Sequence, residues 1–266
     1  MDLRDEQQAD LARLVGGGTE KKGDYAGATK LFLNLAKTQV VRVAEQQLIQ
    51  GKDAEWIALI KKILQGVWKL YDMVQSKNGA GQAVTIEAHC MDGWDRTPQV
   101  MSLLQIMLDP RYRTRKGLAA LLEKDWLAAG HQFHVRPTPP YSGSRSMHEV
   151  APVWAQLLNI LWVWIRARPE LFEYEVVDLM MLWRESFSGS FCGYGEGDPV
   201  RREKELQRAL FWKVFLARPP KPPTDTDITV VRDAEVKVLL NSNLDHYKTN
   251  ENVNENVNDN DDPPLR

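Results

Sequence analysis

Residues 83–108 constrain the fold of this chain more than any other stretch, because a cysteine there separates two segments of opposite character. Residues 83–89 (AVTIEAH) form a short, almost uncharged segment with β-branched residues, which is typical of a buried parallel strand. From Thr97 onward apolar residues recur at helical spacing, and Pro98 suits the first helical position, where a missing N–H costs nothing. The sequence therefore predicts a strand, a tight loop that begins at Cys90, and a helix that Thr97 can cap.

The loop carries the residues of a nucleophilic phosphatase. A turn from a strand into a helix directs backbone N–H groups and the helix dipole to one point, which favours a thiolate at Cys90. Arg96 follows six residues later, and its guanidinium can donate two parallel hydrogen bonds to two phosphate oxygens. Between them, Gly93 relieves crowding of the backbone where the loop is tightest. This pattern indicates hydrolysis of a phosphate monoester through a phosphocysteine, with Asp95 as the nearest proton donor. Thr97 can donate a hydrogen bond to the sulfur when it leaves.

A purely structural reading of the same residues stays open at this point. The spacing Cys-x5-Arg alone is a weak signal, and the predicted strand and helix strengthen it. In the structural reading, Cys90 is a buried thiol and Arg96 pairs with Asp92 or Asp95. The proposed chemistry needs no metal or other cofactor. The five histidines offer no ligand set, since His131 and His134 lie about one helical turn apart without a third ligand nearby.

Composition narrows the function classes. A net charge of −2 over 266 residues excludes the positive field of a nucleic-acid-binding protein, so any anion recognition is local. Two cysteines, Cys90 and Cys192, form no disulfide framework and indicate a reducing compartment, and the acidic start of the chain resembles neither a secretory nor a transit signal. The most apolar stretch, residues 150–165, is too short and interrupted for a membrane span, and it predicts a buried helix.

The chain divides into three predicted parts. Residues 1–29 form a flexible N-terminal segment that begins with a short polar helix over residues 1–15, and residues 30–217 form the folded domain. Residues 218–266 form a Pro-rich linker and a mostly disordered Asn/Asp-rich tail. Asp53 is a predicted N-cap. Within the domain, spacing and breakers predict a second short strand at 30–35 and helices at 37–50, 53–77, 97–108, 114–129, 150–168, 169–187 and 200–216.

Two motifs resemble one known family. HCMDGWDRTPQ (residues 89–99) closely resembles the active-site loop HCSDGWDRTAQ of the myotubularin family. YRTRKGLAALLEKDWLAAGHQFHVR (residues 112–136) is similar to that family's segment YRTxxGF…EKEWLxFGHxFxxR, and weaker similarity extends over residues 30–215. The resemblance implies an α/β, helix-rich Cys-based phosphatase fold with a strand–phosphate loop–helix core. It also implies a 3-phosphatase that acts on phosphatidylinositol 3-phosphate and phosphatidylinositol 3,5-bisphosphate.

The resemblance also assigns roles to individual residues. Cys90 matches the family nucleophile, Arg96 the phosphate-binding arginine and Asp95 the general acid, which this family places inside the loop. Arg136 matches one of two arginines that hold the inositol headgroup. The residues implied to bind phosphate or headgroup are Met91, Asp92, Gly93, Trp94, Thr97, Gln132 and Arg136. Trp94 either lines the pocket or packs beneath the loop.

The chain departs from the family pattern at several positions. Met91 replaces a serine beside the nucleophile, and Gln132 stands where many members have a headgroup arginine, which disfavours the bisphosphate. Residues 36–39 (AKTQ) replace a run that resembles ENIH. The family's PH-GRAM domain and the front half of its phosphatase domain do not fit into residues 1–29. The chain therefore resembles a partial phosphatase domain at residues 30–217, incomplete relative to the family.

Three functional readings follow. Retention of Cys90, Asp95 and Arg96 favours a lipid phosphatase, whereas Met91 and the short length favour an inactive scaffold that binds an active family member. A protein phosphotyrosine phosphatase is disfavoured because the loop is acidic. The expected partners are a phosphoinositide headgroup at a membrane surface and a second myotubularin-family protein. The expected location is the cytoplasm, peripheral to endosomal-type membranes.

Overall fold

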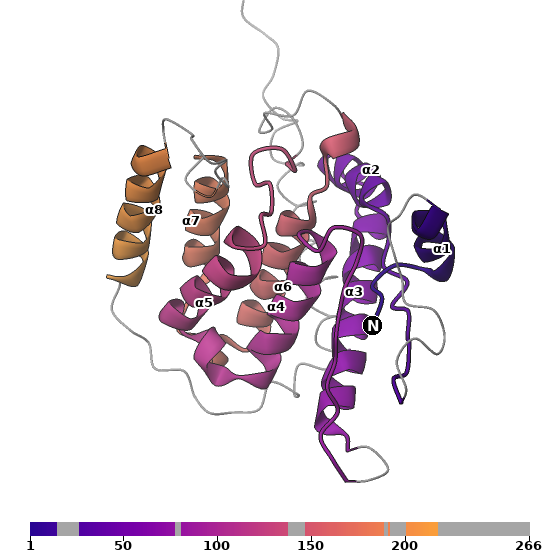
Figure 1. Cartoon of the computed structure of the whole chain (residues 1–266). Coiled ribbons are helices and arrows are strands. Elements are labelled where there is room, and N and C mark those ends of the chain that lie inside the picture. The colour runs from indigo at the N-terminus through magenta and orange to yellow at the C-terminus, as the bar shows by residue number, and fades with distance from the viewer. Residues whose placement is uncertain (15–26, 78–80, 138–146, 189–190, 192–200, 218–266) are drawn as a thin grey trace, which may run out of the picture.

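The computed structural model describes residues 1–14, 27–77, 81–137, 147–188, 191 and 201–217, and within them the fold is helical (Figure 1). The α-helices are α1 (Glu6–Leu14), α2 (Thr38–Ile49), α3 (Ala54–Gln75), α4 (Arg96–Leu108), α5 (Arg115–Leu122), α6 (Val153–Ala167), α7 (Val176–Phe187) and α8 (Arg201–Leu216). Short 3-10 turns span Pro110–Arg113, Met147–Glu149 and Pro169–Leu171, and one π-helical turn spans Glu123–Leu127. Each predicted helix has a counterpart, although the helix predicted over residues 169–187 is divided into the turn Pro169–Leu171 and α7.

Helix α4 lies at the centre of the packing (Figure 1). It contacts α3 on one side and α6 on another, while α2 packs on α3. α7 packs on α6, and α8 packs on both α5 and α7. The helix that follows the cysteine loop is therefore held by the core, which fixes the loop at its N-terminal end.

The predicted buried helix is confirmed. Both α3 and α6 bury an apolar stripe at helical spacing, and ten residues of the 15-residue helix α6 are buried, Gln156 among them. Among the described residues, no helix is long and apolar enough to cross a membrane. The loop that contains Cys192 and the segment 218–266 lie outside the described residues.

The two predicted strands form only extended backbone. In the described part of the chain no multi-residue strand is assigned, and pairing is limited to isolated bridges, two of them parallel, from Asp2 to Phe32 and to His89. Residues 83–88 alternate between exposed and half-buried positions rather than being buried. The composition of this segment favours extended backbone, but a ladder also needs a neighbour along its whole length. In the described chain only its two ends are paired, Ala83 with Lys77 and His89 with Asp2.

Residues 1–4, which belong to the predicted flexible N-terminal segment, lie extended between residues 31–35 and 87–89. Leu3 donates its N–H to the carbonyl of His89 (2.9 Å), and the N–H of Leu35 donates to the carbonyl of Leu3 (2.9 Å). The side chain of Leu3 is fully buried in the core. The start of the described chain is therefore packed against the segment that leads into the cysteine loop.

Two predictions about helix N-termini differ from the structure. Asp53 occupies the N-cap position of α3, but its side chain makes no capping hydrogen bond. α4 begins at Arg96, so Thr97 lies inside the helix and Pro98 is its third residue. Thr97 cannot cap a helix that starts before it, and its hydroxyl is used elsewhere.

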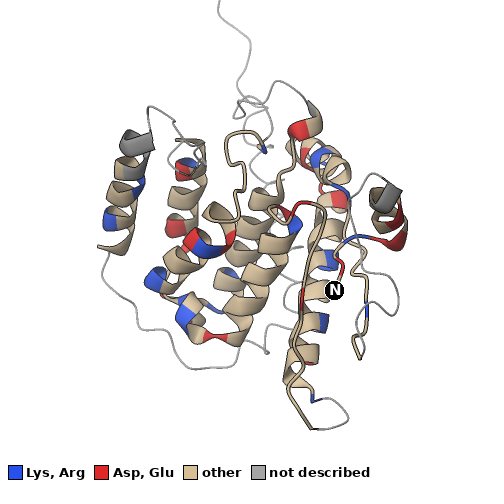
Figure 2. Cartoon of the chain, viewed as in Figure 1, with Lys and Arg blue, Asp and Glu red and all other residues tan. Residues whose placement is uncertain are grey.

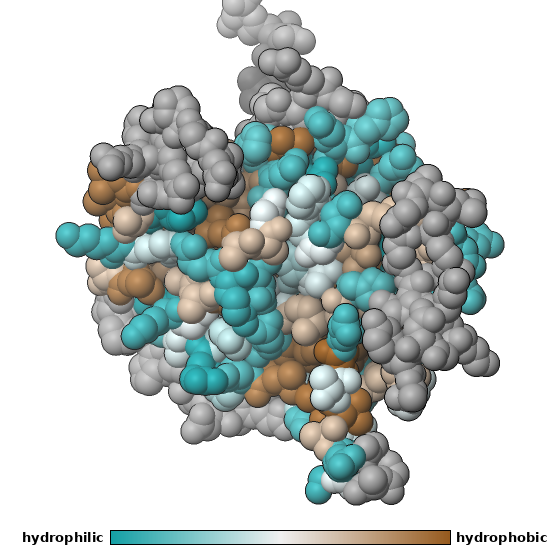
Figure 3. Space-filling view, viewed as in Figure 1, coloured by the Kyte–Doolittle hydropathy of each residue, from teal (hydrophilic) through white to brown (hydrophobic). Residues whose placement is uncertain are grey.

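The described surface mixes charge signs, and α8 carries an apolar stripe on it. Lys and Arg residues are interspersed with Asp and Glu over the helices seen in Figure 2. α8 attaches through its inner aromatic residues, with Phe211 and Trp212 against Phe191. Its outer face leaves Leu206, Leu210 and Val214 exposed, and hydrophobic atoms appear at that edge of the molecule in Figure 3.

Candidate active site

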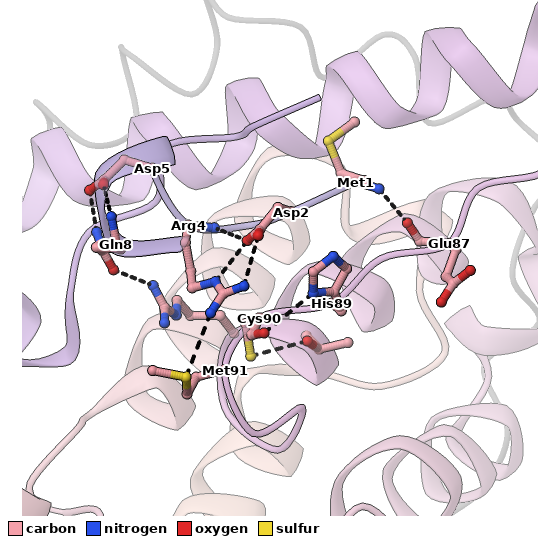
Figure 4. A network of polar contacts seen from close by, with 11 residues as sticks. Met1, Asp2, Arg4, Asp5, Gln8, Glu87, His89, Cys90 and Met91 are labelled. Carbon is pink, nitrogen blue, oxygen red and sulfur yellow. Dashed lines mark hydrogen bonds and ion pairs between the residues drawn. The ribbon is translucent and has the colours of Figure 1, made fainter. Parts of the chain in front are cut away.

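Cys90 lies where the extended segment ends and the loop begins. Its side chain is buried, with 6% of the residue exposed, and the hydroxyl of Thr97 donates a hydrogen bond to its sulfur at 3.2 Å (Figure 4). Thr97 reaches the sulfur because it sits in the first turn of α4, directly across the loop. A hydroxyl donor at this distance stabilises negative charge on the sulfur, both before attack and when the sulfur departs.

Arg96 is the first residue of α4 and is also buried. Its Nη1 donates to the side-chain carbonyl Oε1 of Gln8 at 3.3 Å. Within the described residues it makes no ion pair with Asp92 or Asp95, so the arrangement expected of the purely structural reading is absent there. Gln8 is itself held by Asp5, whose Oδ1 accepts the backbone N–H of Gln8 at 2.7 Å.

Asp95 is buried and closely paired. Its Oδ1 lies 3.0 Å from His131 Nδ1 and 3.1 Å from Arg136 Nε, and its Oδ2 lies 3.0 Å from Arg136 Nη2. Burial alone would raise the pKa of the Asp95 carboxyl, but the hydrogen bonds and charges of His131 and Arg136 outweigh it and lower the pKa. In this conformation Asp95 is therefore a carboxylate with both oxygens engaged.

His131 ties the loop to the core and was missed as a functional residue from sequence. Its Nδ1 lies 2.9 Å from the carbonyl of Trp94 as well as near Asp95. Its ring packs edge-on to Trp126 and Phe133, at centroid distances of 4.8 and 4.7 Å. From the sequence, this histidine was weighed only as a possible metal ligand. The GH pair within the segment of family resemblance was the available signal.

Arg136 and Trp94 form the other side of the loop. The guanidinium carbon of Arg136 lies 5.9 Å from the Trp94 ring centroid, and its Nη1 donates to the carbonyl of Glu149 at 2.7 Å. Trp94 is half-buried, and its indole nitrogen is buried without a partner in the described part of the structure. Gln132 starts the turn that carries Arg136, with its carbonyl accepting the N–H of Arg136 at 3.0 Å.

The outer rim of the loop is open. Met91 is 50% exposed, Asp92 is exposed, and Gly93 adopts φ +82°, a left-handed conformation that favours glycine. The buried Arg4 contacts the rim, since its Nη1 lies 3.6 Å from the sulfur of Met91 (Figure 4). Arg4 is fixed by Asp2 through a bidentate pair at 2.9 and 2.8 Å.

A small cleft adjoins Arg96. Gln99 and Gln156 line it, together with Leu35 and Ala36 from the extended segment before α2. Gln99 donates from its amide nitrogen to Gln156 Oε1 and to the carbonyl of Val153, both at 3.1 Å. Of the residues 36–39 that depart from the family run, Ala36 thus lies beside the arginine and offers only a methyl group.

Taken together, the loop and the first turn of α4 carry the kinds of group that phosphoryl transfer to sulfur requires. A buried thiol with a hydroxyl donor supplies a nucleophile, and a buried guanidinium beside it supplies a site for an oxyanion. The carboxylate of Asp95 lies in the same loop, directly before the arginine. Such an arrangement suits a substrate that carries a phosphate monoester.

Comparison with known proteins agrees with this chemistry. The family described as myotubularin-like phosphatase domain matches residues 1–196. Three relatives carry the name phosphatidylinositol-3,5-bisphosphate 3-phosphatase. MTMR8 of Homo sapiens is 30% identical over 238 residues, which are 83% of this chain and 33% of the relative. MTMR4 of Mus musculus is 31% identical, over 77% of this chain and 18% of the relative. MTMR2 of Gallus gallus is 29% identical, over 79% and 39%.

The matched region includes the first residues of the chain, so residues 1–4 and α1 lie within the family domain. The match covers 18% to 39% of the length of these three relatives. The family match covers the cysteine loop, the segment with His131 and Arg136, and helices α1 to α7. The chain belongs to the myotubularin-like phosphatase family.

Proposed function

We propose that the chain removes the 3-phosphate of phosphatidylinositol 3-phosphate through a phosphocysteine intermediate. The observation that carries this proposal is the placement of Cys90 at the start of the loop and of Arg96 and Thr97 in the first turn of α4, with the Thr97 hydroxyl donating to the Cys90 sulfur. The names of the relatives, all phosphoinositide 3-phosphatases, support the substrate class.

The proposed reaction has two steps. The Cys90 thiolate attacks phosphorus in line, a sulfur–phosphorus bond forms, and the bond from phosphorus to the inositol 3-oxygen breaks. Arg96 bears the charge on the equatorial oxygens. Water then attacks the phosphocysteine, inorganic phosphate leaves, and the Cys90 thiolate returns under the hydrogen bond from Thr97.

Asp95 is the proposed donor of the proton that the leaving inositol oxygen takes. As described it is a carboxylate, so substrate must change its surroundings before it can donate. Arg136, which now pairs with Asp95, matches a headgroup-binding arginine of the family. An anionic headgroup competes for that guanidinium, and burial of Asp95 then favours the protonated carboxyl. Substrate binding would in this way prepare the acid.

The monophosphate is the preferred substrate in this proposal. The relatives are named for the 3,5-bisphosphate, but Gln132 replaces an arginine that many members use for the headgroup. A neutral amide binds an added phosphate more weakly than a guanidinium does. The bisphosphate is therefore expected to be a poorer substrate for this chain.

The wider setting is also part of the proposal. The extended segments at residues 1–4, 31–35 and 87–89 are the start of a central sheet in an α/β core that is incomplete relative to the family. The enzyme works peripherally on endosomal-type membranes from the cytoplasm, since its substrate is a lipid.

A second myotubularin-family protein is the proposed partner that brings it there, because stable attachment to a membrane takes more than one signal.

The test is phosphate release from short-chain phosphatidylinositol 3-phosphate. Cys90→Ser is expected to abolish release and Asp95→Asn to reduce it by roughly 100-fold or more, the usual contribution of a general acid. Cys192→Ser is the matched control, since it changes the only other cysteine, and it is expected to keep the parent rate. A folded parent that releases no more phosphate than Cys90→Ser would contradict the proposal.

A further inference from the structure

We infer that Gln8 is a positioning residue that holds the phosphate-binding guanidinium of Arg96 in its working orientation. The inference rests on the proposed function and deepens it, because it assigns part of the phosphate site to the first helix of the chain. The two residues lie 88 positions apart in sequence, and Arg96 Nη1 donates to Gln8 Oε1 at 3.3 Å (Figure 4).

The hydrogen bond to Gln8 is what holds the guanidinium of Arg96 in place. Across the described ranges, the guanidinium of Arg96 makes no other hydrogen bond or ion pair. A guanidinium offers five N–H donors, and a phosphate takes two of them along one edge. Gln8 engages only Nη1, so the edge formed by Nε and Nη2 stays available to an oxyanion while the group is kept from rotating.

Asp5 fixes the orientation of the Gln8 side chain, whose carbonyl oxygen is the acceptor for Arg96. Its carboxylate accepts both the backbone N–H of Gln8, at 2.7 Å, and the side-chain amide N–H of Gln8. The amide nitrogen of Gln8 is thus turned toward Asp5, and the carbonyl oxygen toward Arg96. The hydrogen bonds from Gln8 and the charges of Lys37 and Arg96 outweigh the effect of burial and lower the pKa of the Asp5 carboxyl.

The neutrality of Gln8 matters for an anion site. A carboxylate at this position would orient Arg96 equally well, but it would cancel the positive charge that attracts phosphate. It would also face the carboxylate of Asp5 at close range. An amide orients the guanidinium and leaves its full charge for the ligand, as a phosphate site requires.

The experiment measures binding of inorganic phosphate by the whole chain of residues 1–266. Phosphate protects Cys90 from alkylation by iodoacetamide, mapped by peptide mass, and the protection curve yields a Kd. Gln8→Met keeps the size of the side chain and removes the acceptor, and Gln7→Met is the matched control on an exposed position of the same helix. Gln8→Glu tests the charge, and Asp5→Ala releases Gln8 without changing it.

Gln8→Met is expected to raise the Kd for phosphate roughly tenfold, the usual effect of losing a hydrogen bond to a charged group. Gln8→Glu is expected to raise it further, Asp5→Ala to raise it less, and Gln7→Met to leave it unchanged. The three glutamine variants are expected to keep the melting temperature, whereas Asp5→Ala also loses the hydrogen bond that caps α1 and melts lower. On the lipid substrate, Gln8→Met is expected to lower kcat more than it raises KM. A merely structural role would lower the melting temperature and would not make Gln8→Glu the weakest binder.

Parent-like phosphate binding by Gln8→Met, or an equal loss in Gln7→Met, would overturn the inference. If Gln8→Met melts early, Asp5→Ala decides by the same measurement. A parent that binds phosphate through Gln8 but releases none from the lipid would refute the proposed function and leave this inference standing. A parent that turns over the lipid, with Gln8→Met equally active and equally protected, would refute only the inference.

Discussion

At the scale of single residues, Asp95 connects the stability of the loop to its chemistry. It is buried between a guanidinium and an imidazole, and both of its oxygens are engaged. A general acid needs a proton, whereas these partners favour the carboxylate. In the proposed mechanism, the contacts that hold the loop in place therefore have to loosen during turnover.

Asp95→Asn is expected to lower the free energy of unfolding by about 3 kcal/mol at pH 7, because it leaves Arg136 without its buried partner. The pKa of Asp95 is lowered in the folded chain, so its stabilisation is complete above the unfolded value of about 3.9. It is lost as pH falls below about 4, through the lowered folded pKa. Urea unfolding at pH 7 and pH 3 measures both, and equal stability of parent and variant at pH 7 would contradict the ion pair.

His131 carries its hydrogen on Nδ1, because both neighbours of that nitrogen, the Trp94 carbonyl and the Asp95 carboxylate, are acceptors. Nε2 is buried without a hydrogen-bond partner in the described structure. We expect ¹⁵N chemical shifts of labelled protein to identify the Nδ1–H form. His131→Ala should cost at least about 2 kcal/mol, and His134→Ala, on an exposed position, less than about 0.5 kcal/mol. A spectrum in which Nδ1 carries no hydrogen would refute this account of the loop.

At the scale of elements, the junction between the 3-10 turn Pro110–Arg113 and α5 depends on a glycine. Thr114 caps α5 by accepting the N–H of Gly117 at 3.0 Å, and a Cβ on Gly117 would lie 1.8 Å from the carbonyl oxygen of Arg111. That oxygen belongs to backbone and cannot rotate away. The two elements can pack this closely only because residue 117 has no side chain.

Gly117→Ala is therefore expected to destabilise the chain by about 3 kcal/mol, although alanine is the better helix former. Ala120→Gly is the reference, since it changes an exposed position of the same helix and should cost about 1 kcal/mol through helix propensity alone. Thermal unfolding followed by circular dichroism compares the two. A more stable Gly117→Ala would mean that the two elements do not pack as described.

The sequence predicted the helices well and the extended segments poorly, for a physical reason. Helical spacing in α3 and α6 is a local pattern, because the apolar residues that meet the core recur along one helix. The β-branched residues before Cys90 predict extended backbone equally locally. Whether such a segment becomes a strand depends on a neighbour along its whole length, and among the described residues only its ends Ala83 and His89 have one, at Lys77 and Asp2.

The same difference between local and distant residues applies to the candidate site. Cys90, Arg96 and Thr97 lie within eight consecutive residues, so their spacing alone constrains how they meet. Gln8 and Arg4 reach the loop from 88 and 87 positions away, and no sequence pattern connects them to it. The roles of such residues follow from the packing of the whole chain and were open to prediction only from a structure.

At the scale of the whole molecule, the N-terminal residues belong to the phosphatase unit. Leu3, Ala9 and Ala12 are buried in the core, and residues 1–4 bridge the two extended segments that flank α2 and α3. From the same short stretch, Arg4 and Gln8 reach the cysteine loop. Removing this stretch would therefore affect the core and the active-site loop together.

A chain that starts at residue 15 is expected to lose at least about 3 kcal/mol, or roughly 10 °C in melting temperature, through the lost burial and hydrogen bonds. Its Cys90 should react faster with iodoacetamide, because the loop loses two of its contacts. We propose that residues 218–266 are a linker and tail, so a chain that ends at residue 217, after α8, is the control and should melt with the parent. If the chain from residue 15 melted with the parent and its Cys90 reacted at the parent rate, the first helix would be an accessory to the domain, and Gln8 could not be what orients Arg96.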